Sequence, residues 1–348
     1  MLDKRWIGIS LLAVMLLLAG CDATSQEEAP VSREEIGLRQ EVEAVFEIGQ
    51  GMEQEDIGVE VKQITMMKNA DFGEGRSSDA LVVTLIVDNA NANGLQLHPE
   101  SGKILLPTGE ELLSAKGDYQ ETYPNGTVKK GDFYFPLQLT KLNEIDGLTL
   151  ILEGPANQYY EPVGEEYVFD VQVRHPSYQA VDRETLLQRV YDQSATLSQA
   201  AGVSDTFHAG EQVEMGPVTV HLMDVMIYEN IQHPFAAFLN LEEPVHFIGI
   251  SLAVENNSDD MVYFSNARNK LLLGDAVIKD MDHLMSRYMG QAFHGGAIKT
   301  GTAFFRAEEE ELEALSALSL LMESPWEMEG EEKRLLSENR RVELGGRE

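Results

Sequence analysis

Residues 80–92 read ALVVTLIVDNANA, and residues 248–260 read IGISLAVENNSDD. In each stretch, a run of β-branched and other apolar residues is followed at once by acidic and amide residues. A run that is apolar on both faces is typical of a strand in the middle of a sheet, where both faces are covered. Asn and Asp suit the turn that follows, because they tolerate positive φ angles and cap backbone groups. The two stretches therefore predict two central strands, each leaving its sheet through a polar turn.

Further short apolar segments surround the first of these stretches. Gly, Asn, Asp and Pro lie between the segments, as in the PNG turn at residues 124–126. Short strands separated by turn residues are typical of a β-sandwich. The predicted strands are residues 59–64, 103–107, 132–139, 148–152 and 167–173.

The pattern recurs in the second half of the chain. FEIGQ at Phe46 is echoed by FHAGE at Phe207, KKGDFYF by KTGTAFF, and LTLIL by LSLLM, in the same order. The offset grows from 161 residues at the two phenylalanines to 170 between Gly131 and Gly301. Chance alternation of apolar residues is the alternative, but ordered echoes at a slowly growing offset favour two copies of one domain.

These motifs together resemble a family. A central strand ending in VDNANA or VENNSDD, then a KKGDFYF or KTGTAFF strand, then LTLIL or LSLLM, is similar to the telokin-like, immunoglobulin-fold domains of Gram-positive bacterial lipoproteins. The resemblance implies an all-β fold of two tandem immunoglobulin-like β-sandwiches, joined here by a short helical linker. It also implies no enzymatic activity. The second copy departs from the pattern after Met322, where nothing matches YVFDVQV, so its final strand stays open.

The first residues read as a leader rather than as part of the fold. Lys4 and Arg5 precede an apolar run at residues 6–19, which is too short to span a bilayer comfortably and suits a signal peptide. The run ends in LAGC at residues 18–21, which resembles the lipobox of bacterial lipoproteins. That resemblance implies cleavage before Cys21 and a lipid, including palmitate-type acyl chains, on its thiol. We therefore expect a lipid anchor in the cell membrane, with the protein on the extracytoplasmic face.

Composition limits the partners and the stabilising forces. Cys21 is the only cysteine, so no intrachain disulfide can form and burial alone must hold the fold together. The formal net charge is −33; residues 1–20 carry +1, which leaves −34 for the rest. Such a surface repels phosphate backbones, so we expect no nucleic acid partner. It favours solubility or the attraction of cations or of a basic partner.

The chain thus divides into six predicted segments. A helix is expected in the break between the two copies, where AVDRETLLQRVYDQ has apolar residues near helical spacing. Residues 36–46 either hold a short helix or continue the tether. The segments are a lipoprotein signal peptide (1–20), an acidic flexible tether (21–45), immunoglobulin-like domain 1 (46–175), a helical linker (176–205), immunoglobulin-like domain 2 (206–325) and a charged C-terminal tail (326–348).

The polar turn after the first central strand imitates a calcium loop. Starting at Asn89, it places Asn91, Asn93, Gly94 and Glu100 at EF-hand positions 3, 5, 6 and 12. An EF-hand loop begins with Asp between two helices, and this frame would retain only one ligand carboxylate. The stretch is better interpreted as the exit of a strand.

Three other chemistries fail on similar grounds. GISLA around Ser251 lacks the last glycine of a nucleophile elbow and sits inside a strand pattern. Zinc binding would need a loop to fold back on itself, and thioether binding of copper is rarer than Met packing. The zinc candidates are His233, His246, Glu242 and Glu243, and the copper candidates are Met281, Met285 and Met289. We expect no metal, no cofactor and no catalytic residue.

An apolar insertion in the second copy is the candidate partner contact. PFAAFLN at residues 234–240 carries Phe235, Phe238 and Leu239 in an otherwise acidic sequence. Loops between sandwich strands often carry recognition, although packing on the domain itself is the alternative. The expected function is a non-catalytic binding or scaffolding role of a membrane-anchored lipoprotein at the cell surface. The alternative is a lipoprotein that binds or senses a solute or cation through its acidic surface.

Overall fold

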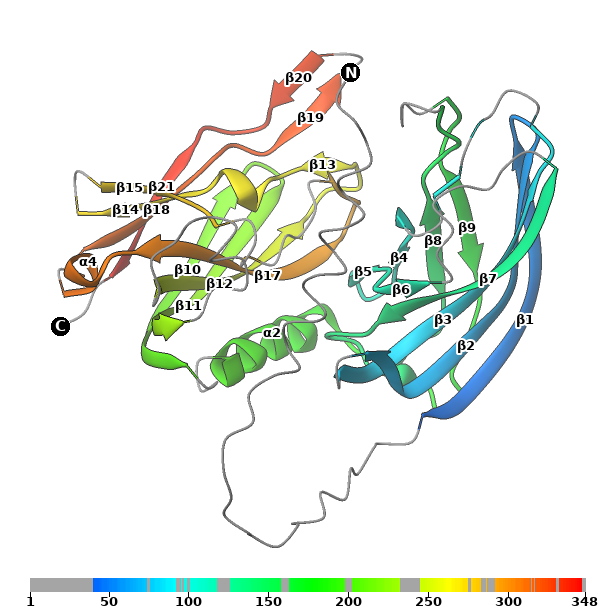
Figure 1. The fold of residues 1–348 in the computed structure, drawn as a ribbon, viewed down its shortest axis with the longest axis horizontal. Coiled ribbons are helices and arrows are strands. Elements are labelled where there is room, and N and C mark those ends of the chain that lie inside the picture. Colours follow the sequence, from blue (N-terminus) through cyan, green and yellow to red (C-terminus); the bar gives the residue numbers. More distant parts are fainter. Residues whose placement is uncertain are drawn as a thin grey trace, which may run out of the picture. The chain divides into compact units, whose positions relative to one another are not determined.

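The computed structural model describes most of residues 40–345, and most of these lie in antiparallel strands. The chain is thus mostly β, as predicted, with several antiparallel sheets (Figure 1). The predicted signal peptide (1–20) and most of the predicted tether (21–45) lie outside the described residues. The gaps are residues 74–75, 92–94, 96, 99–100, 118–125, 158–162, 198–201, 232–244, 275–276, 283–285, 287–291, 314, 316 and 330–331.

Two sheets form from the first half of the described chain. In the larger sheet, the strands lie side by side in the order β1 (Glu41–Gln54), β2 (Ile57–Gly73), β3 (Arg76–Asn89), β7 (Thr127–Pro136) and β6 (Lys116–Gly117). In the smaller sheet, the order is β5 (Glu111–Leu113), β4 (Lys103–Leu105), β8 (Leu148–Leu152) and β9 (Tyr167–Val171). The short helix η2 (Leu142–Glu144) precedes β8.

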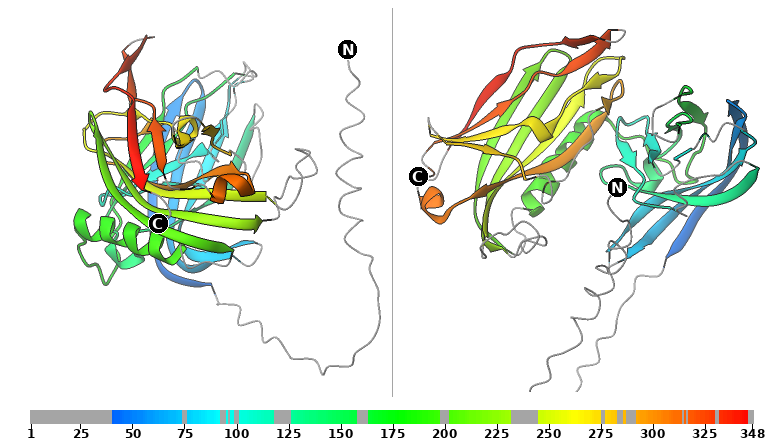
Figure 2. Two further views of the ribbon diagram at one scale, coloured as in Figure 1. Left: turned by 90° about the vertical axis from the view of Figure 1, so that its left-hand side faces the viewer. Right: turned by 45° about the horizontal axis from the view of Figure 1, so that its top comes forward.

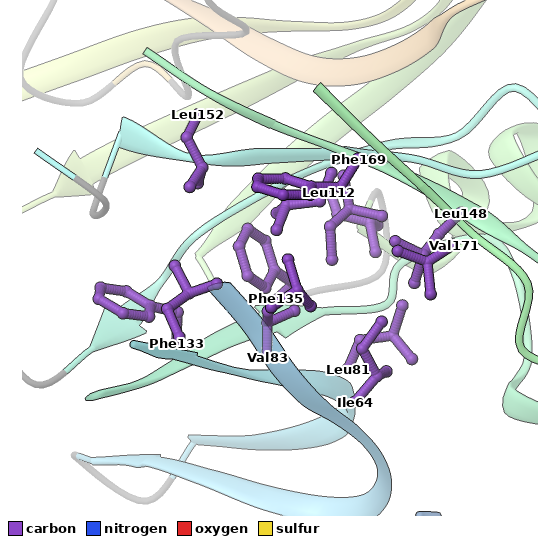
Figure 3. Close-up of a cluster of buried hydrophobic side chains, with 14 of the residues drawn as sticks. Ile64, Leu81, Val83, Leu112, Phe133, Phe135, Leu148, Leu152, Phe169 and Val171 are labelled. Carbon is purple, nitrogen blue, oxygen red and sulfur yellow. The ribbon is translucent and has the colours of Figure 1, made fainter. Parts of the chain in front are cut away.

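Apolar residues at alternate positions of these two sheets share one core. Figure 3 shows Phe135 of β7 pointing toward Leu112 of β5 and Phe169 of β9, and all three are nearly or fully buried. Burying one such side chain contributes about 1.5–3 kcal/mol. Because no disulfide is available, this packing is what holds the two sheets together.

Three sheets form from the second half. One has the order β10 (Val203–Met215), β11 (Val218–Ile231), β12 (Val245–Asn256) and β17 (Ile298–Ala307). The next has β15 (Val277–Asp280), β14 (Lys270–Leu273), β18 (Leu318–Met322) and β21 (Arg340–Gly345). The third has β16 (Ala292–Phe293), β13 (Val262–Tyr263), β19 (Trp326–Glu329) and β20 (Glu332–Leu335). Short helices η3 (Asn266–Arg268) and α4 (Glu309–Glu313) complete this half, and a second core contains residues of all three sheets.

The strand predictions around the opening stretches are confirmed. β3 lies between β2 and β7, and β12 lies between β11 and β17, so both are central in their sheets. The two halves also share a shift in strand register, which lies in the similar segments FEIGQ and FHAGE. The pairing of β1 with β2 shifts between Glu47 and Gln50, and that of β10 with β11 shifts between His208 and Glu211. Gly49 and Gly210 have φ angles of 69° and 62° at these shifts, a region that favours glycine.

Both ends of the described chain differ from the prediction. Residues 41–45, expected in the tether, begin β1, so neither a helix nor a tether occupies residues 41–46. Residues 326–348, expected as a charged tail, contain β19, β20 and β21. β21 pairs with β18 as β9 pairs with β8, which supplies the final strand that the sequence left open. β21 forms because its apolar and charged residues alternate. Leu344 is buried in the second core, while its two neighbours in the strand face outward.

The predicted helix in the break between the two copies is present as α2 (Arg183–Leu197). Asp182 caps its first turn, because Asp182 Oδ1 accepts a hydrogen bond from the backbone N–H of Thr185 at 2.8 Å. That interaction with Thr185 holds the pKa of Asp182 below its ordinary value. Leu186 and Val190 are buried one turn apart against Met223, Ala253 and Ile298. The helix therefore lies against the sheet that contains β11 and β12 (Figure 2).

Candidate functional site

Three polar side chains meet in the interior, and Glu111 is far in the sequence from the other two, His294 and Lys299. Glu111 of β5 lies 3.1 Å from His294 through Oε2 and Nδ1, and 2.7 Å from Lys299 of β17 through Oε1 and Nζ. The side chains of Glu111 and Lys299 are 0% and 6% exposed. Lys299 Nζ also donates to the carbonyl of Ala292 and lies 4.4 Å from the ring centroid of Phe293. The cluster thus joins β5 to β17 without leaving a buried charge alone.

The electrostatics of this cluster favour the ionised acid. Burial by itself would raise the pKa of Glu111, but the hydrogen bond from His294 and the charge of Lys299 hold that pKa below its ordinary value. A paired buried charge is tolerated, whereas removing one partner is strongly destabilising. The cluster therefore stabilises the fold, and we expect a substitution in it to lower the free energy of unfolding strongly.

The neighbouring acid has a different environment. Glu110 is 2% exposed, and its carboxylate accepts backbone hydrogen bonds from Gln138, Leu139 and Thr140 at 2.6–2.9 Å. Burial raises the pKa of Glu110 despite these bonds. A pocket of about 160 Å³ lies beside Glu110, Glu111 and Lys299. Because the charged groups that line it already bond to the protein, the pocket offers a ligand few free partners.

The helix α2 carries two arginines that make further ion pairs. Arg189 binds both carboxylate oxygens of Glu144, at 2.6 and 2.7 Å, and donates to the carbonyl of Leu139. Arg183 donates to Glu255 at 2.8 Å and to the carbonyl of Gly296 at 2.9 Å. The helix is therefore tied to both halves of the described chain.

The acids of these pairs are both shifted toward ionisation. Burial would raise the pKa of Glu144, but hydrogen bonding to Arg189 outweighs it and lowers that pKa. Burial would likewise raise the pKa of Glu255, but hydrogen bonds from His221 and Arg183 lower it. His221 Nε2 lies 2.7 Å from Glu255 Oε2, and Tyr191 Oη lies 3.1 Å from His221 Nδ1. Arg183 and Tyr191 of α2 thus form one network with His221 and Glu255 of the sheet.

Because these carboxyl groups have lowered pKa values, we expect the fold to lose stability in acid. Glu111, Glu144 and Glu255 each have a folded-state pKa lowered from the ordinary value of a glutamate side chain. Such a group stabilises the fold above the unfolded pKa, and this contribution is lost as pH falls through the folded pKa. We expect the urea midpoint, followed by circular dichroism, to fall as pH is lowered from about 5 to about 3.

A variant pair identifies the source of that loss. Glu255→Gln should show a shallower acid dependence than the wild type, whereas Glu309→Gln, at an exposed acid of α4, should not. Equal slopes for all three proteins would contradict this assignment.

The serine considered as a nucleophile lies in a strand, as predicted. Ser251 is 2% exposed within β12, and its hydroxyl contacts that of Ser194, which also donates to Asp224. His208 Nδ1 lies 3.0 Å from the other oxygen of Asp224. In a catalytic triad the imidazole lies between hydroxyl and carboxylate. Here the carboxylate lies between them and both hydroxyls are buried, so the cluster is arranged for packing.

The calcium-like loop is a strand exit. β3 ends at Asn89, whose buried amide donates to the carbonyl of Leu95 and accepts from the backbone N–H of Asn91. Asn256 ends β12 in the same way, and its amide contacts the carbonyls of Asp260, Phe293 and His294 at 2.7–3.0 Å. Asn89 and Asn256 thus hold the backbone of the turn that follows each central strand, while Glu100 lies outside the described residues.

Most of the other sequence candidates also fall outside the described residues. His246 is described, and its Nδ1 accepts from the backbone N–H of Asn230 at 3.4 Å. Met281 is 4% exposed and packs in the second core. Among the residues that the structure describes, no three His, Cys, Asp or Glu side chains gather as metal ligands. The candidate residues that lie outside the described part of the chain are Cys21, His233, Phe235, Phe238, Leu239, Glu242, Glu243, Met285 and Met289.

An open groove on the larger sheet of the first half is the surface that sequence reasoning missed. It has a volume of about 390 Å³ and lies over the end of the β1–β2 hairpin and the adjoining ends of β3 and β7. Two glycines form part of its floor, and apolar and acidic side chains surround them. Its residues are Gly51, Met52, Glu53, Gly58, Val59, Glu60, Ile86, Asp88 and Val128. Glycine inside a strand pattern, as in GQGM and DIGVE, was the available signal.

The hairpin end that carries the groove is fixed by the turn after β3. Glu55 and Asp56, which connect β1 to β2, both have positive φ angles, of 49° and 61°. The side-chain amide of Asn91 donates to the carbonyl of Glu55, and the backbone N–H of Ala90 donates to that of Asp56 at 2.9 Å. These hydrogen bonds fix the backbone around the groove. A partner could therefore bind without a large loss of conformational entropy in the hairpin.

Comparison with known proteins gives no family. No protein-family model matches this chain, and neither does any curated protein. No helix within the described ranges is both long and apolar enough to cross a bilayer.

Several solved structures are distantly similar. A protein of unknown function from Listeria monocytogenes has 10% identity and a TM-score of 0.32, covering 42% of this chain and 87% of that one. A candidate lipoprotein of Bacillus subtilis, YcdA, has 14% identity and a TM-score of 0.29, covering 39% of this chain and 38% of that one. A conserved domain protein from Bacillus anthracis has 11% identity and a TM-score of 0.26, covering 86% and 89%. Likenesses at this level establish neither a family nor a function.

Proposed function

We propose that this chain is a lipoprotein anchored on the extracytoplasmic face of the cell membrane, with a non-catalytic binding or scaffolding role at the cell surface. The observation that carries the proposal is LAGC at residues 18–21, directly after a basic start and an apolar run of signal-peptide length. Cys21 is the only cysteine and stands where a lipid-modified residue would stand. Acyl chains add about 0.8 kcal/mol of membrane affinity per buried methylene.

The body of the protein would consist of two tandem immunoglobulin-like sandwiches with α2 between them. In support, each half has a four-strand run in the same order, β1–β2–β3–β7 and β10–β11–β12–β17. Each run shares a core with a second sheet, and each carries the same bulge near its edge strand. Loops that a rigid scaffold holds in place often carry recognition.

A binding role also agrees with how the polar groups are used. The buried acids Glu110, Glu111 and Glu255 bond to backbone or basic groups of the protein itself. The buried hydroxyls of Ser194 and Ser251 bond to each other. The groove over β1 and β2 is instead open, which makes it the best placed of these features to meet a partner.

Processing at Cys21 tests the anchor. We expect wild-type cells to incorporate labelled palmitate into the protein and to retain it in the membrane fraction until detergent is added. The Cys21→Ser variant should incorporate no label, and globomycin should cause the uncleaved precursor to accumulate. Ser25→Ala, at a neighbouring hydroxyl, is the matched control and should behave as the wild type. Unchanged processing and retention of Cys21→Ser would sink the proposal.

A further inference from the structure

The hollow in the groove exists because two positions of the β1–β2 hairpin are glycines and have no side chain. Gly51 pairs with Glu60, and Gly58 pairs with Glu53, across the β1–β2 hairpin. Neither glycine has a positive φ angle, so the backbone does not require glycine at either position. A Cβ on Gly58 would meet nothing closer than Asp88 Cβ at 3.8 Å, and one on Gly51 nothing closer than the carbonyl of Val59 at 3.7 Å. Glycine inside a strand often marks a close approach by another chain.

The sides of the groove are apolar and exposed. Val128 of β7 is 64% exposed, although it lies in a regular strand, and Ile86 of β3 is on the same outer face of the sheet. Met52 pairs with the buried Val59, so its side chain lies on the other face and does not form a side of the groove. Apolar side chains around a hollow fit the hydrocarbon part of a side chain from a partner.

The groove is also acidic. Glu53, Glu60 and Asp88 come from three adjacent strands and border the same apolar hollow. Lys62 lies 3.7 Å from Glu60, but both side chains are largely exposed, so this pair contributes little. The chain as a whole carries a net charge of −33, which adds a long-range attraction for cationic partners.

We propose that this groove binds an extended basic segment of a protein partner through an arginine or lysine side chain. The aliphatic stem of that side chain would lie over Ile86 and Val128, and its cationic end would reach the carboxylates of Glu53, Glu60 and Asp88. The inference rests on the proposed binding role and names the partner class for it. The apolar and acidic side chains of the groove match the two parts of one basic side chain, whereas an apolar peptide or a bare metal ion would match only one of them.

The test uses fluorescein-labelled octa-arginine and the full-length protein in detergent, with anisotropy measured at about 0.15 M salt. Neutralising the border in Glu53→Gln/Glu60→Gln/Asp88→Asn should weaken binding about tenfold, equivalent to about 1.4 kcal/mol. The matched control Glu309→Gln/Glu310→Gln/Glu338→Gln removes the same charge at exposed positions elsewhere and should weaken it less than about threefold.

A second variant separates the groove from charge alone. Gly58→Val fills the hollow with no change of charge and should weaken binding about tenfold. Its thermal midpoint should not fall, because the strand has room for the side chain and valine favours strands. Full binding by Gly58→Val, or equal losses in both charge variants, overturns the proposal and assigns the binding to the acidic surface in general. Because the assay does not depend on Cys21, failure here is distinct from failure of the membrane anchor.

Discussion

Replacing Lys299 with methionine should destabilise the fold by about 3–5 kcal/mol. Methionine keeps most of the apolar stem but removes the ammonium group that pairs with Glu111 at 2.7 Å. The Glu111 side chain is fully buried, so water cannot replace that cation. His294 remains, but it contacts the other oxygen of the carboxylate. Urea unfolding at pH 7, followed by circular dichroism, measures the loss.

Two further variants isolate the buried charge as the cause. Lys62→Met removes a lysine whose ion pair with Glu60 is largely exposed, and its effect should stay below about 1 kcal/mol. Adding Glu111→Gln to Lys299→Met should recover part of the loss, because no unpaired charge then stays buried. A Lys299→Met protein as stable as the wild type would show that Glu111 is not held as an anion.

Replacing Asn256 with aspartate should cost about 3–5 kcal/mol as well. The amide nitrogen of Asn256 faces three backbone carbonyls, those of Asp260, Phe293 and His294, and the residue is fully buried. Aspartate has the same size but places a carboxylate oxygen against those three oxygens. The change converts hydrogen bonds into repulsion without altering volume. Chemical unfolding of the purified variant measures it.

The neighbouring residue provides the matched control. Asn257→Asp makes the same chemical change at an exposed position, where the side-chain amide donates to the hydroxyl of Thr219, so its effect should stay within about 1 kcal/mol. Asn89→Asp, at the equivalent strand end in the first half, should fall between the two because the amide there donates to Leu95. Similar losses at Asn256 and Asn257 would contradict the assigned role.

The strands could be predicted from the sequence because alternation is a local signal. The apolar runs of β3 and β12 and their amide-rich exits indicated both the central strands and the turn positions. The start of β1 was missed because it is an edge strand whose acidic, exposed residues resemble a tether. β21 was missed because Val342 and Leu344 are its only large apolar residues within a charged segment.

The candidate sites were harder to predict, because they depend on contacts between distant segments. Glu111 and Lys299 are 188 positions apart, and nothing in the local pattern around either residue indicates the other. The groove depends on the β1–β2 hairpin, which brings Gly51 and Gly58 close together, and on the pairing of Gly58 with Asp88 of β3. Single glycines in a sequence indicate only that such an approach is sterically open.

The attachments of α2 bear on how this chain can be dissected. A C-terminal fragment beginning at residue 206, the boundary that sequence repetition suggests, would leave out Leu186 and Val190 and so uncover Met223 and Ala253. This fragment would also lack Arg183, which donates a hydrogen bond to Glu255. A cut before Asp182 keeps that cover but deprives Glu144 of Arg189 in the other fragment. Because α2 contacts both halves of the described chain, neither half can be expressed alone with all of its native contacts.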